Sequence, residues 1–367
     1  MSTLLITGCA GFIGYHVAHR LLTRGADVIG VDSLTPYYDP ALKHARLANL
    51  ATSDRFRFRQ LDICDGEPLS RLVKECRPAA LIHLAAQAGV RYSIENAAAY
   101  GSANLVGWLN VLEASRHAAV PHVVFASSSS VYGATDVTPF CTSQRADHPI
   151  SLYAATKRAG ELMAHSYAHL YDLPITVLRF FTVYGPFGRP DMALFTFTRA
   201  ILDGQPLLLF NRGQMSRDFT YVDDIAECVV RVAARPPTPN GEWNAHQPDP
   251  ATSTAPYRVF NVGNGKPVPL RRLVELLEEN LGKSAIIQDY PMQPGDVPAT
   301  WADTGNLLSY VAFRPQVSIE EGVRRFVEWY RSHYQLTDCA PPVSARTPRA
   351  HATVQRPSDA EWERQSA

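Results

Sequence analysis

The sequence predicts an α/β fold in which a doubly wound parallel sheet is followed by a smaller mixed α/β region. Two observations carry this prediction. Short apolar segments alternate with helical patterns through the first half of the 367-residue chain, and such alternation is typical of βαβ units whose helices cover both faces of a parallel sheet. The first apolar segment also runs into a glycine-rich turn that opens a helical pattern.

Each element of the first half is predicted from its own periodicity. The strands are short apolar runs bounded by turn residues, and the helices are longer segments in which apolar residues recur every three or four positions. The predicted strands cover residues 3–7, 26–32, 56–61, 79–85, 122–127 and 174–180. The predicted helices cover about 12–23, 65–76, 100–118 and 153–171. We expect right-handed crossovers between the strands.

The pattern changes after Phe181. A turn at Tyr184-Gly185-Pro186 leads into elements of both kinds, and the segment 236–256 carries six prolines, which indicates a surface insertion. The predicted elements are helices at 193–203, from Val222, at 269–281 and at 318–334, and strands at 206–210, 257–262 and 285–290.

This change of pattern predicts the domain organisation. Residues 1–181 are expected to form a nucleotide-binding domain, to which segments near 222–262 return. Residues 182–334 are expected to form mainly the substrate-binding domain. Residues 335–367 are polar and show little periodicity, so we expect a disordered tail.

The composition argues against several classes of function. Lys and Arg number 35 and Asp and Glu also number 35, so the net charge is zero and nothing favours a nucleic-acid or membrane surface. The six cysteines form no CxxC pair and no histidine cluster has zinc spacing, so no metal site is expected. The cysteines are interpreted as thiols of a reducing compartment. No signal peptide or membrane span is recognised.

A glycine triplet marks the first candidate site. Gly8, Gly11 and Gly14 stand in TGCAGFIG, where the first predicted strand meets the first predicted helix. Gly8 would allow the tight turn, Gly11 would let the backbone approach a pyrophosphate, and Gly14 would permit close packing of helix on strand. The spacing is GxxGxxG rather than GxGxxG, but its place between strand and helix is that of a Rossmann dinucleotide site.

Residues at the ends of later strands complete this site. Asp32 ends the second strand and is expected to bind the adenosine ribose hydroxyls, and its charge would repel a 2′-phosphate, so NAD is favoured over NADP. Asp62 ends the third strand, where it could meet the adenine amino group. The small residues Ala85 and Ala86 would let the backbone pass under the cofactor. The residues expected around it are Gly8, Gly11, Phe12, Ile13, Gly14, Asp32, Asp62, Ile63, Leu84, Ala85, Ala86 and Gln87.

The candidate catalytic residues follow the fifth strand. Tyr153 and Lys157 stand in YAATK, four residues apart and therefore on one helical face. A free tyrosine has a pKa of about 10, and a nearby ammonium together with the positive nicotinamide ring is expected to lower it, so that Tyr153 can act as a base. Both residues also belong to the expected cofactor site. A hydroxyl of the serine run 127–130 could bridge Tyr153 and the reacting oxygen; Ser128 is the first choice and Ser130 the second.

Together these segments resemble the extended short-chain dehydrogenase/reductases over about residues 1–334. TGCAGFIG, HLAAQAG, SSSSVYG, YAATK and RDFTYVDD stand where that family places them. Longer segments are similar to the UDP-glucuronate 4-epimerases within the family: QAGVRYSIENAAAY, HPISLYAATKRAGELMAHSYAHLY, LRFFTVYGPFGRPDMALF and MQPGDVPATWAD. Matches of this length are far more specific than any single motif.

The resemblance implies an isomerase with tightly held NAD that converts UDP-glucuronate into UDP-galacturonate through a 4-keto intermediate, with Ser128, Tyr153 and Lys157 in catalysis. It also places Asn104 and Thr182 near the sugar or the nicotinamide. UDP-galactose 4-epimerase and UDP-glucuronate decarboxylase are the alternative enzymes, and a dinucleotide sensor without catalysis is the alternative of another class.

The diphosphate would be held by arginine. The resemblance places Arg217, in the RDF segment, at this group. Many related epimerases carry a second arginine two residues before the Gly-Asp pair at 295–296, but this chain has Gln293 there. We therefore expect one cationic contact to the diphosphate to be missing.

A uronate substrate also needs protection from a side reaction. The 4-keto glucuronate is a β-keto acid, which loses carbon dioxide when the breaking C–C bond aligns with the carbonyl π system. An arginine that holds the carboxylate out of this alignment would suppress the loss, and Arg189 is the first candidate and Arg91 the second. The expected substrate-binding residues are Arg91, Ser128, Ser130, Thr182, Arg189 and Arg217.

The resemblance also implies a homodimer packed through the predicted helices 100–118 and 153–171. Plant-type members carry an N-terminal membrane anchor, whereas this sequence starts at its first strand. We therefore expect a bacterial, cytoplasmic member that supplies galacturonate for surface polysaccharide.

Overall fold

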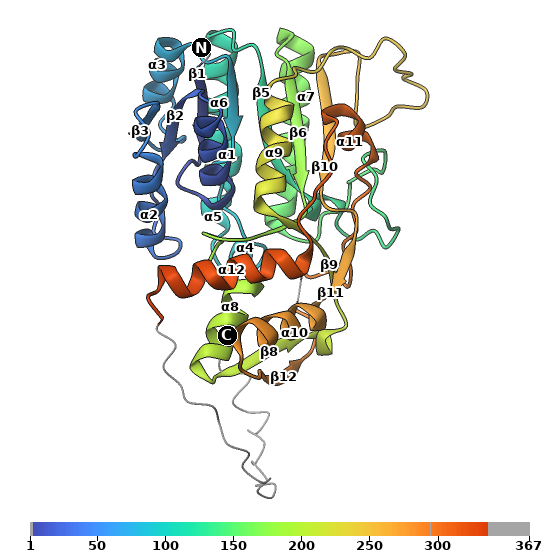
Figure 1. Cartoon of the computed structure of the whole chain (residues 1–367). Coiled ribbons are helices and arrows are strands. Elements are labelled where there is room, and N and C mark those ends of the chain that lie inside the picture. Colours follow the sequence, from blue (N-terminus) through green and yellow to red (C-terminus); the bar gives the residue numbers. More distant parts are fainter. Residues whose placement is uncertain (1–2, 294, 337–367) are drawn as a thin grey trace, which may run out of the picture. The chain divides into compact units, whose positions relative to one another are not determined.

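A seven-stranded parallel sheet is the main feature of the computed structural model (Figure 1). The strand order is β10-β6-β5-β4-β1-β2-β3. The chain thus winds outward from β1 in both directions, which confirms the predicted doubly wound α/β class. The structure describes residues 3–293 and 295–336, so the predicted tail lies outside the described residues from 337 onward.

The central strands are buried on both faces. Leu5, Ile82 and Val177, for example, are fully buried, as expected for parallel strands between two helical layers. The edge strand β3 is mostly exposed or partly exposed. The strands of this sheet are β1 (Thr3–Thr7), β2 (Asp27–Asp32), β3 (Phe56–Gln60), β4 (Ala80–His83), β5 (Val123–Ser128), β6 (Ile175–Phe180) and β10 (Tyr257–Val262).

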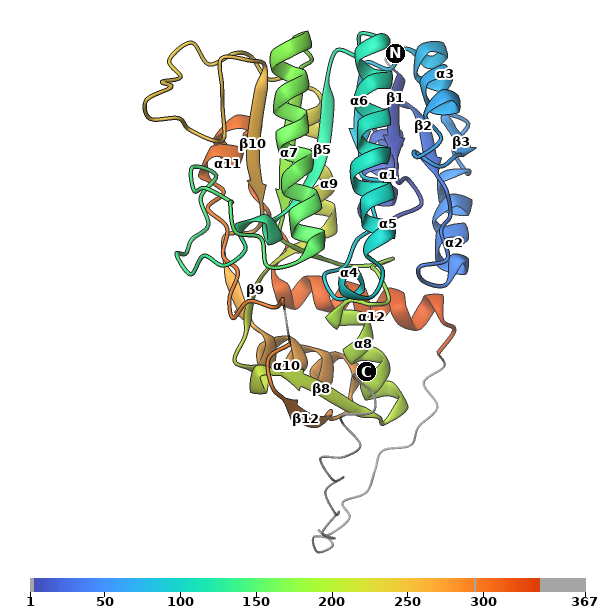
Figure 2. The ribbon, with the colours of Figure 1, turned by 180° about the vertical axis from the view of Figure 1, so that it is seen from behind.

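Two helical layers cover the sheet, one on each face (Figures 1 and 2). One core, around Val17 and Val229, packs α1 and α9 against the strands. The other core, around Trp108 and Leu112, packs α3, α6 and α7 against the opposite face. The helices of these layers are α1 (Phe12–Thr23), α2 (Pro40–Leu50), α3 (Gly66–Cys76), α6 (Gly107–His117), α7 (Leu152–Tyr171) and α9 (Val222–Ala233).

Several helical segments differ from the prediction. The helix expected at 100–118 is built from α5 (Ala97–Gly101), a π-helical turn (Ser102–Val106) and α6. The helix α2 was not predicted, although its start carries a signal, because Asp39 accepts a hydrogen bond from the Ala41 N–H at 2.9 Å and Pro40 occupies the first turn. A short helix, α4 (Tyr92–Glu95), was also missed.

Smaller elements form a third core around Phe195, Leu277 and Phe326. They include a three-stranded sheet in the order β11-β9-β7 and a two-stranded sheet of β8 and β12. Contacts group residues up to Tyr330 in one compact unit, and the boundary at 181–182 stays a prediction. These elements are β7 (Thr182–Tyr184), α8 (Ala193–Asp203), β8 (Pro206–Phe210), β9 (Ser216–Tyr221), β11 (Pro267–Pro269), α10 (Leu270–Leu281), β12 (Ile286–Tyr290) and α12 (Ile319–His333). The helix α11 (Gly305–Val311) packs instead on the core of α1 and α9.

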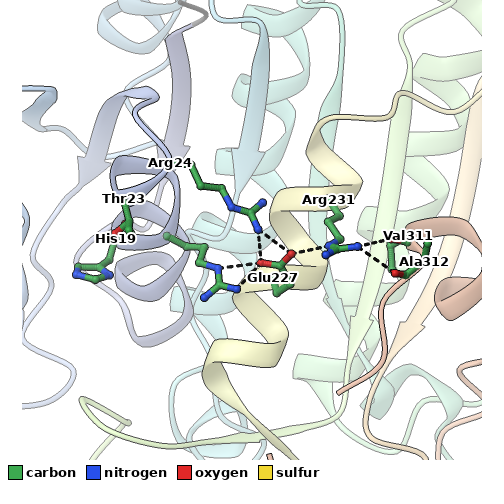
Figure 3. A network of polar contacts seen from close by, with 8 residues as sticks. His19, Thr23, Arg24, Glu227, Arg231, Val311 and Ala312 are labelled. Carbon is green, nitrogen blue, oxygen red and sulfur yellow. Dashed lines mark hydrogen bonds and ion pairs between the residues drawn. The ribbon is translucent and has the colours of Figure 1, made fainter. Parts of the chain in front are cut away.

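A buried carboxylate joins α1 to α9 (Figure 3). The side chain of Glu227 is only 2% exposed, and it accepts hydrogen bonds from Arg20 and Arg24 of α1 and from Arg231 of its own helix. Arg231 also donates to the Val311 carbonyl at 3.0 Å, at the end of α11. Burial alone would raise the pKa of Glu227, but the three guanidinium groups outweigh burial and lower this pKa to about 2.

Candidate active site

The carboxyl ends of the parallel strands open into a cavity of about 440 Å³. Ligands of open α/β sheets bind at this edge, because the loops that follow the strands meet there. The walls include all the residues expected around a dinucleotide except Asn104, together with Ser128 and Arg189. The sequence-predicted cofactor site and the predicted catalytic serine and tyrosine therefore share one cavity.

The glycine turn is built as the spacing predicts. Gly8 has a φ of +77°, and a Cβ there would lie 2.6 Å from the Ala85 nitrogen. A Cβ on Gly14 would lie 2.0 Å from the Gly8 carbonyl oxygen, so only glycine lets α1 begin this close to the turn. The turn before α1 and the start of α1 consequently border the cavity with three residues that have no side chain, Gly8, Gly11 and Gly14.

Asp32 lies at the end of β2 with both carboxylate oxygens engaged. One accepts the Ala10 N–H at 3.1 Å and the other accepts the Leu34 N–H at 2.9 Å. Lys43 of α2, which sequence reasoning missed, lies 3.8 Å from the same carboxylate and also lines the cavity. This cation partly offsets the negative charge on which the preference for NAD over NADP was argued.

Asn104 has a different place from the one expected. It is buried behind the cavity wall, where its side chain accepts from the Gln87 N–H at 2.9 Å and donates to the Gln87 carbonyl and to Thr156. It therefore fixes the backbone after β4 against α7 and does not itself border the cavity.

The serine run and α7 bring the expected catalytic groups together. Ser151 begins α7 by accepting the Ala154 N–H at 3.1 Å, which places Tyr153 in the first turn beside the cavity. Ser128 ends β5, and its Oγ lies 3.2 Å from both the nitrogen and the Oγ of Ser130. Ser128 and Tyr153 both line this cavity, and the Ser128 side chain acts to lower the pKa of the Tyr153 phenol.

The electrostatics of Tyr153 differ from the expectation. Burial raises the pKa of its phenol, and the Ser128 side chain and the Arg189 charge oppose this shift without reversing it. Lys157 donates to the Ala126 carbonyl at 2.8 Å, and burial lowers its pKa to about 7. Lysine thus supplies less positive charge to Tyr153 than the YAATK spacing alone suggested.

Three of the expected substrate residues border a second cavity of about 160 Å³, lined by Ser130, Thr182, Arg217 and Asp296 among others. Burial lowers the pKa of Arg217, which Asp296 partly restores. Arg91 lines neither of these two cavities. It pairs with Asp296 at 3.3 Å and stacks on Phe210 at 4.6 Å, so it is less well placed than Arg189 to hold a group beside Tyr153.

Arg189 lines the large cavity beside Tyr153 and is held by a neighbouring acid. Its Nε donates to Asp191 Oδ1 at 3.0 Å and its Nη2 donates to Asp191 Oδ2. Tyr37, from the loop after β2, donates to the same carboxylate at 3.0 Å. Neither Asp191 nor Tyr37 was predicted, because no local pattern links loops that lie about 150 positions apart.

Within the described ranges, no three His, Cys, Asp or Glu side chains gather so that they could hold a metal ion. None of the helices that the structure describes has both the length and the hydropathy that a bilayer span needs.

Residues 4–245 match the NAD dependent epimerase/dehydratase family. The chain belongs to this family. Over 354 residues it is 51% identical to a probable UDP-glucuronate 4-epimerase of Rhizobium meliloti, a match that covers 95% of this chain and 99% of that protein. UDP-glucuronate 4-epimerase 1 of Arabidopsis thaliana is 43% identical over 338 residues, which cover 90% of this chain and 77% of the plant protein.

A solved structure also has a fold similar to that of this chain. The UDP-glucuronic acid 4-epimerase from Bacillus cereus, in complex with UDP-glucuronic acid and NAD, matches with a TM-score of 0.79 and 30% identity, over 90% of this chain and all of that one. As a member of the NAD dependent epimerase/dehydratase family, the chain uses the cofactor that its sequence predicted.

The cavity residues fit NAD. The bare glycine turn leaves room for a pyrophosphate at the start of α1, where backbone N–H groups and the helix dipole favour negative charge. Asp32 stands at the end of β2, the position from which this family holds ribose hydroxyls. Asp62, Ile63 and Cys64 also line the cavity, where the sequence predicts the adenine, and Asp62 is fixed by accepting the Cys64 N–H at 2.8 Å.

Proposed function

We propose that this epimerase converts UDP-glucuronate into UDP-galacturonate by inverting C4 of the sugar through a 4-keto intermediate. The observation that carries the proposal is the shared cavity, in which Ser128, Tyr153 and Arg189 meet beside the dinucleotide site. A base, a hydroxyl that orients it and a cation for a carboxylate are the groups that the reaction needs from the protein.

The roles follow from the contacts. Tyr153 takes the proton of the 4-hydroxyl and later returns it. Ser128, which is hydrogen-bonded to Ser130, holds the reacting oxygen in place beside Tyr153. Lys157 is buried one turn further along α7. In its protonated, positively charged form, Lys157 stabilises the Tyr153 phenolate. NAD supplies the chemistry that these residues lack, a hydride acceptor that also gives the hydride back, so no net oxidation occurs.

The neighbouring cavity is proposed to hold the UDP part of the substrate. Arg217 provides the cation for the diphosphate, and Thr182 and Ser130 line the same cavity. Because Gln293 stands where many related epimerases have a second arginine, Arg217 neutralises more of the diphosphate charge here than in those enzymes.

Product analysis tests the proposal. The purified protein is incubated with UDP-glucuronate without added NAD, and the nucleotide sugars are separated and weighed by mass spectrometry. We expect an isomer of unchanged mass that co-elutes with UDP-galacturonate. A pentose product with carbon dioxide would instead indicate a decarboxylase. Turnover of UDP-galactose but not of UDP-glucuronate would indicate the other epimerase, and binding of NAD without any turnover would indicate a sensor.

We further propose that the enzyme is a cytoplasmic homodimer whose product feeds polysaccharide synthesis. Five cysteines of the described residues are free thiols, which suits a reducing compartment. On the outer face of α6 and α7, apolar side chains such as Leu109 and Leu162 are 41% and 56% exposed, as at a surface covered by a second copy.

A further inference from the structure

Three loops from different parts of the chain converge on Arg189. Arg189 and Asp191 follow β7, Tyr37 follows β2, and Gly89 follows β4. Gly89 has a φ of +105°, and a Cβ there would lie 2.7 Å from the Tyr37 hydroxyl. The close approach of Tyr37 to Asp191 thus requires glycine at position 89. This requirement indicates a specific arrangement of the three loops rather than an incidental surface contact.

The contacts divide the Arg189 guanidinium into two edges. The Nε–Nη2 edge is occupied by the two oxygens of Asp191 in a bidentate pair. Among the described residues, the structure gives Nη1 no hydrogen-bond acceptor, so the Nη1–Nη2 edge is free to take a second carboxylate. A guanidinium held along one edge has its plane fixed, and a ligand on the other edge inherits that plane.

Tyr37 completes this support. Its hydroxyl donates to Asp191 Oδ2 at 3.0 Å, and its ring lies 5.9 Å from the Arg189 guanidinium. Burial and the Asp191 charge raise the pKa of Tyr37 to about 12, so the phenol stays protonated and donates at neutral pH. Asp191 therefore receives hydrogen bonds from both partners and stays ionised between them.

We propose that Asp191 and Tyr37 are positioning residues that fix the plane of Arg189, and through it the plane of the uronate carboxylate, so that the 4-keto intermediate is epimerised rather than decarboxylated. This inference rests on the proposed function. In the reaction that they prevent, the bond between C5 and the carboxyl carbon breaks and carbon dioxide leaves. The electron pair forms an enolate with the C4 carbonyl, and the enolate takes a proton to give a 4-keto pentose.

The charge of Asp191 predicts whether variants at this site change mainly KM or mainly kcat. In Asp191→Asn, Arg189 loses its fixed anion, so its attraction for the substrate carboxylate is kept or strengthened while its orientation loosens. We expect kcat to fall roughly tenfold, as for a modest misplacement of a reacting group, with KM unchanged or lower and UDP-pentose or its 4-keto precursor among the products. Tyr37→Phe removes one hydrogen bond, so we expect kcat to fall about threefold in the same pattern.

A double variant tests whether the two residues act through Arg189. Arg189→Ala alone should lose more rate than either variant, and adding Asp191→Asn to it should change nothing further, because the group to be positioned is gone. Asp27→Asn is the matched control: it removes an Arg55 ion pair of 3.3 Å at the start of β2, away from the cavity. This control should keep wild-type kinetics and products.

The outcomes separate this inference from the proposed function. If the wild type forms no UDP-galacturonate, the proposed function itself is wrong. If the wild type is an epimerase but Asp191→Asn keeps the wild-type kcat and forms no decarboxylated product, the inference is overturned. It is also overturned if both single variants act mainly by raising KM and lowering thermal stability together, as a merely structural role predicts, or if the double variant is additive.

Discussion

At the scale of single residues, Tyr153 is the group whose environment matters most to the proposed reaction. Burial raises the pKa of its phenol, and the Ser128 side chain and the Arg189 charge act in the opposite direction. Proton transfer at the 4-hydroxyl therefore depends on a few contacts in one cavity and cannot be supplied by the backbone.

Tyr153→Phe removes the hydroxyl and leaves the ring. Since positioned acid–base catalysis contributes roughly 10²–10⁴-fold, we expect kcat to fall by at least about two orders of magnitude while NAD stays bound. The measurement is turnover of UDP-glucuronate together with NAD content. Tyr171→Phe, at the far end of the same helix, should keep its activity, and a folded Tyr153→Phe protein with near-normal turnover would remove Tyr153 from the role of base.

Residue-scale prediction succeeds where the chemistry is written in one short segment. Gly8 and Asp32 border the cavity because each lies at, or just after, the end of a predicted strand, and Tyr153 borders it from the first turn of a predicted helix. Lys43 and Asp191 were not predicted. The contact of Lys43 with Asp32, and the contacts of Asp191 with Arg189 and Tyr37, depend on how loops fold back on the edge of the sheet. Charge at the site is therefore the part that a single sequence predicts least well.

At the scale of elements, strands were easier to predict than helices with interruptions. The predicted strands 3–7, 56–61 and 122–127 agree with β1, β3 and β5 to within about two residues at their ends. The π-helical turn before α6 was missed because a residue inserted into a helical ladder does not interrupt the apolar pattern. β7 and β11 are three residues each, too short for a period to be visible.

The contact between α1 and α9 gives a prediction about stability. Glu227 is buried among three arginines, and Glu227→Gln removes the only anion of that cluster in the structure's described part. Breaking a buried, charge-assisted set of this kind costs about 2 kcal/mol or more. We therefore expect a lower Tm at pH 7 with equal NAD occupancy. Glu67→Gln, which breaks an exposed pair with Arg71, should change Tm little.

The wild type and Glu227→Gln should also differ in how their Tm depends on pH. The folded-state pKa of Glu227 is about 2, below its ordinary value of 4.5, so its contribution is fully present above pH 4.5 and is lost as pH falls toward 2. The difference in Tm between wild type and Glu227→Gln should therefore shrink on acidification through this window. A difference that stays constant down to the lowest pH at which both are folded would mean that packing, and not charge, explains the effect.

At the scale of the whole molecule, the parallel sheet follows from the alternation of strands and helices. The fold class and the family that the sequence predicted are both confirmed. How the remaining elements divide into domains is less accessible to sequence. α9 and β10 come late in the chain but pack on the large sheet, whereas α8 and β8, which precede them, belong to the third core. Long-range packing decides this, and no local pattern encodes it.

The last prediction concerns assembly. α6 and α7 lie side by side on the face turned to the viewer in Figure 2, and both expose apolar side chains: Leu109 of α6 is 41% and Leu162 of α7 is 56% exposed. Two copies that meet through these helices would bury the same patch on each, as a two-fold dimer requires. Light scattering after size exclusion should therefore give twice the mass of one chain.

Charges placed on this surface should separate the copies. In Leu109→Glu/Leu162→Glu, a dimer would bury four carboxylates without partners, at a cost that such interfaces do not tolerate. A monomer would keep both side chains in water, so the fold itself should be little affected. We expect the mass of a single chain with an unchanged circular dichroism spectrum. Ile287→Glu is the matched control, because Ile287 is 43% exposed on β12, far from α6 and α7 in sequence and fold, and it should remain a dimer. A wild-type monomer, or a double variant that keeps the dimer mass, would show that α6 and α7 do not form the interface.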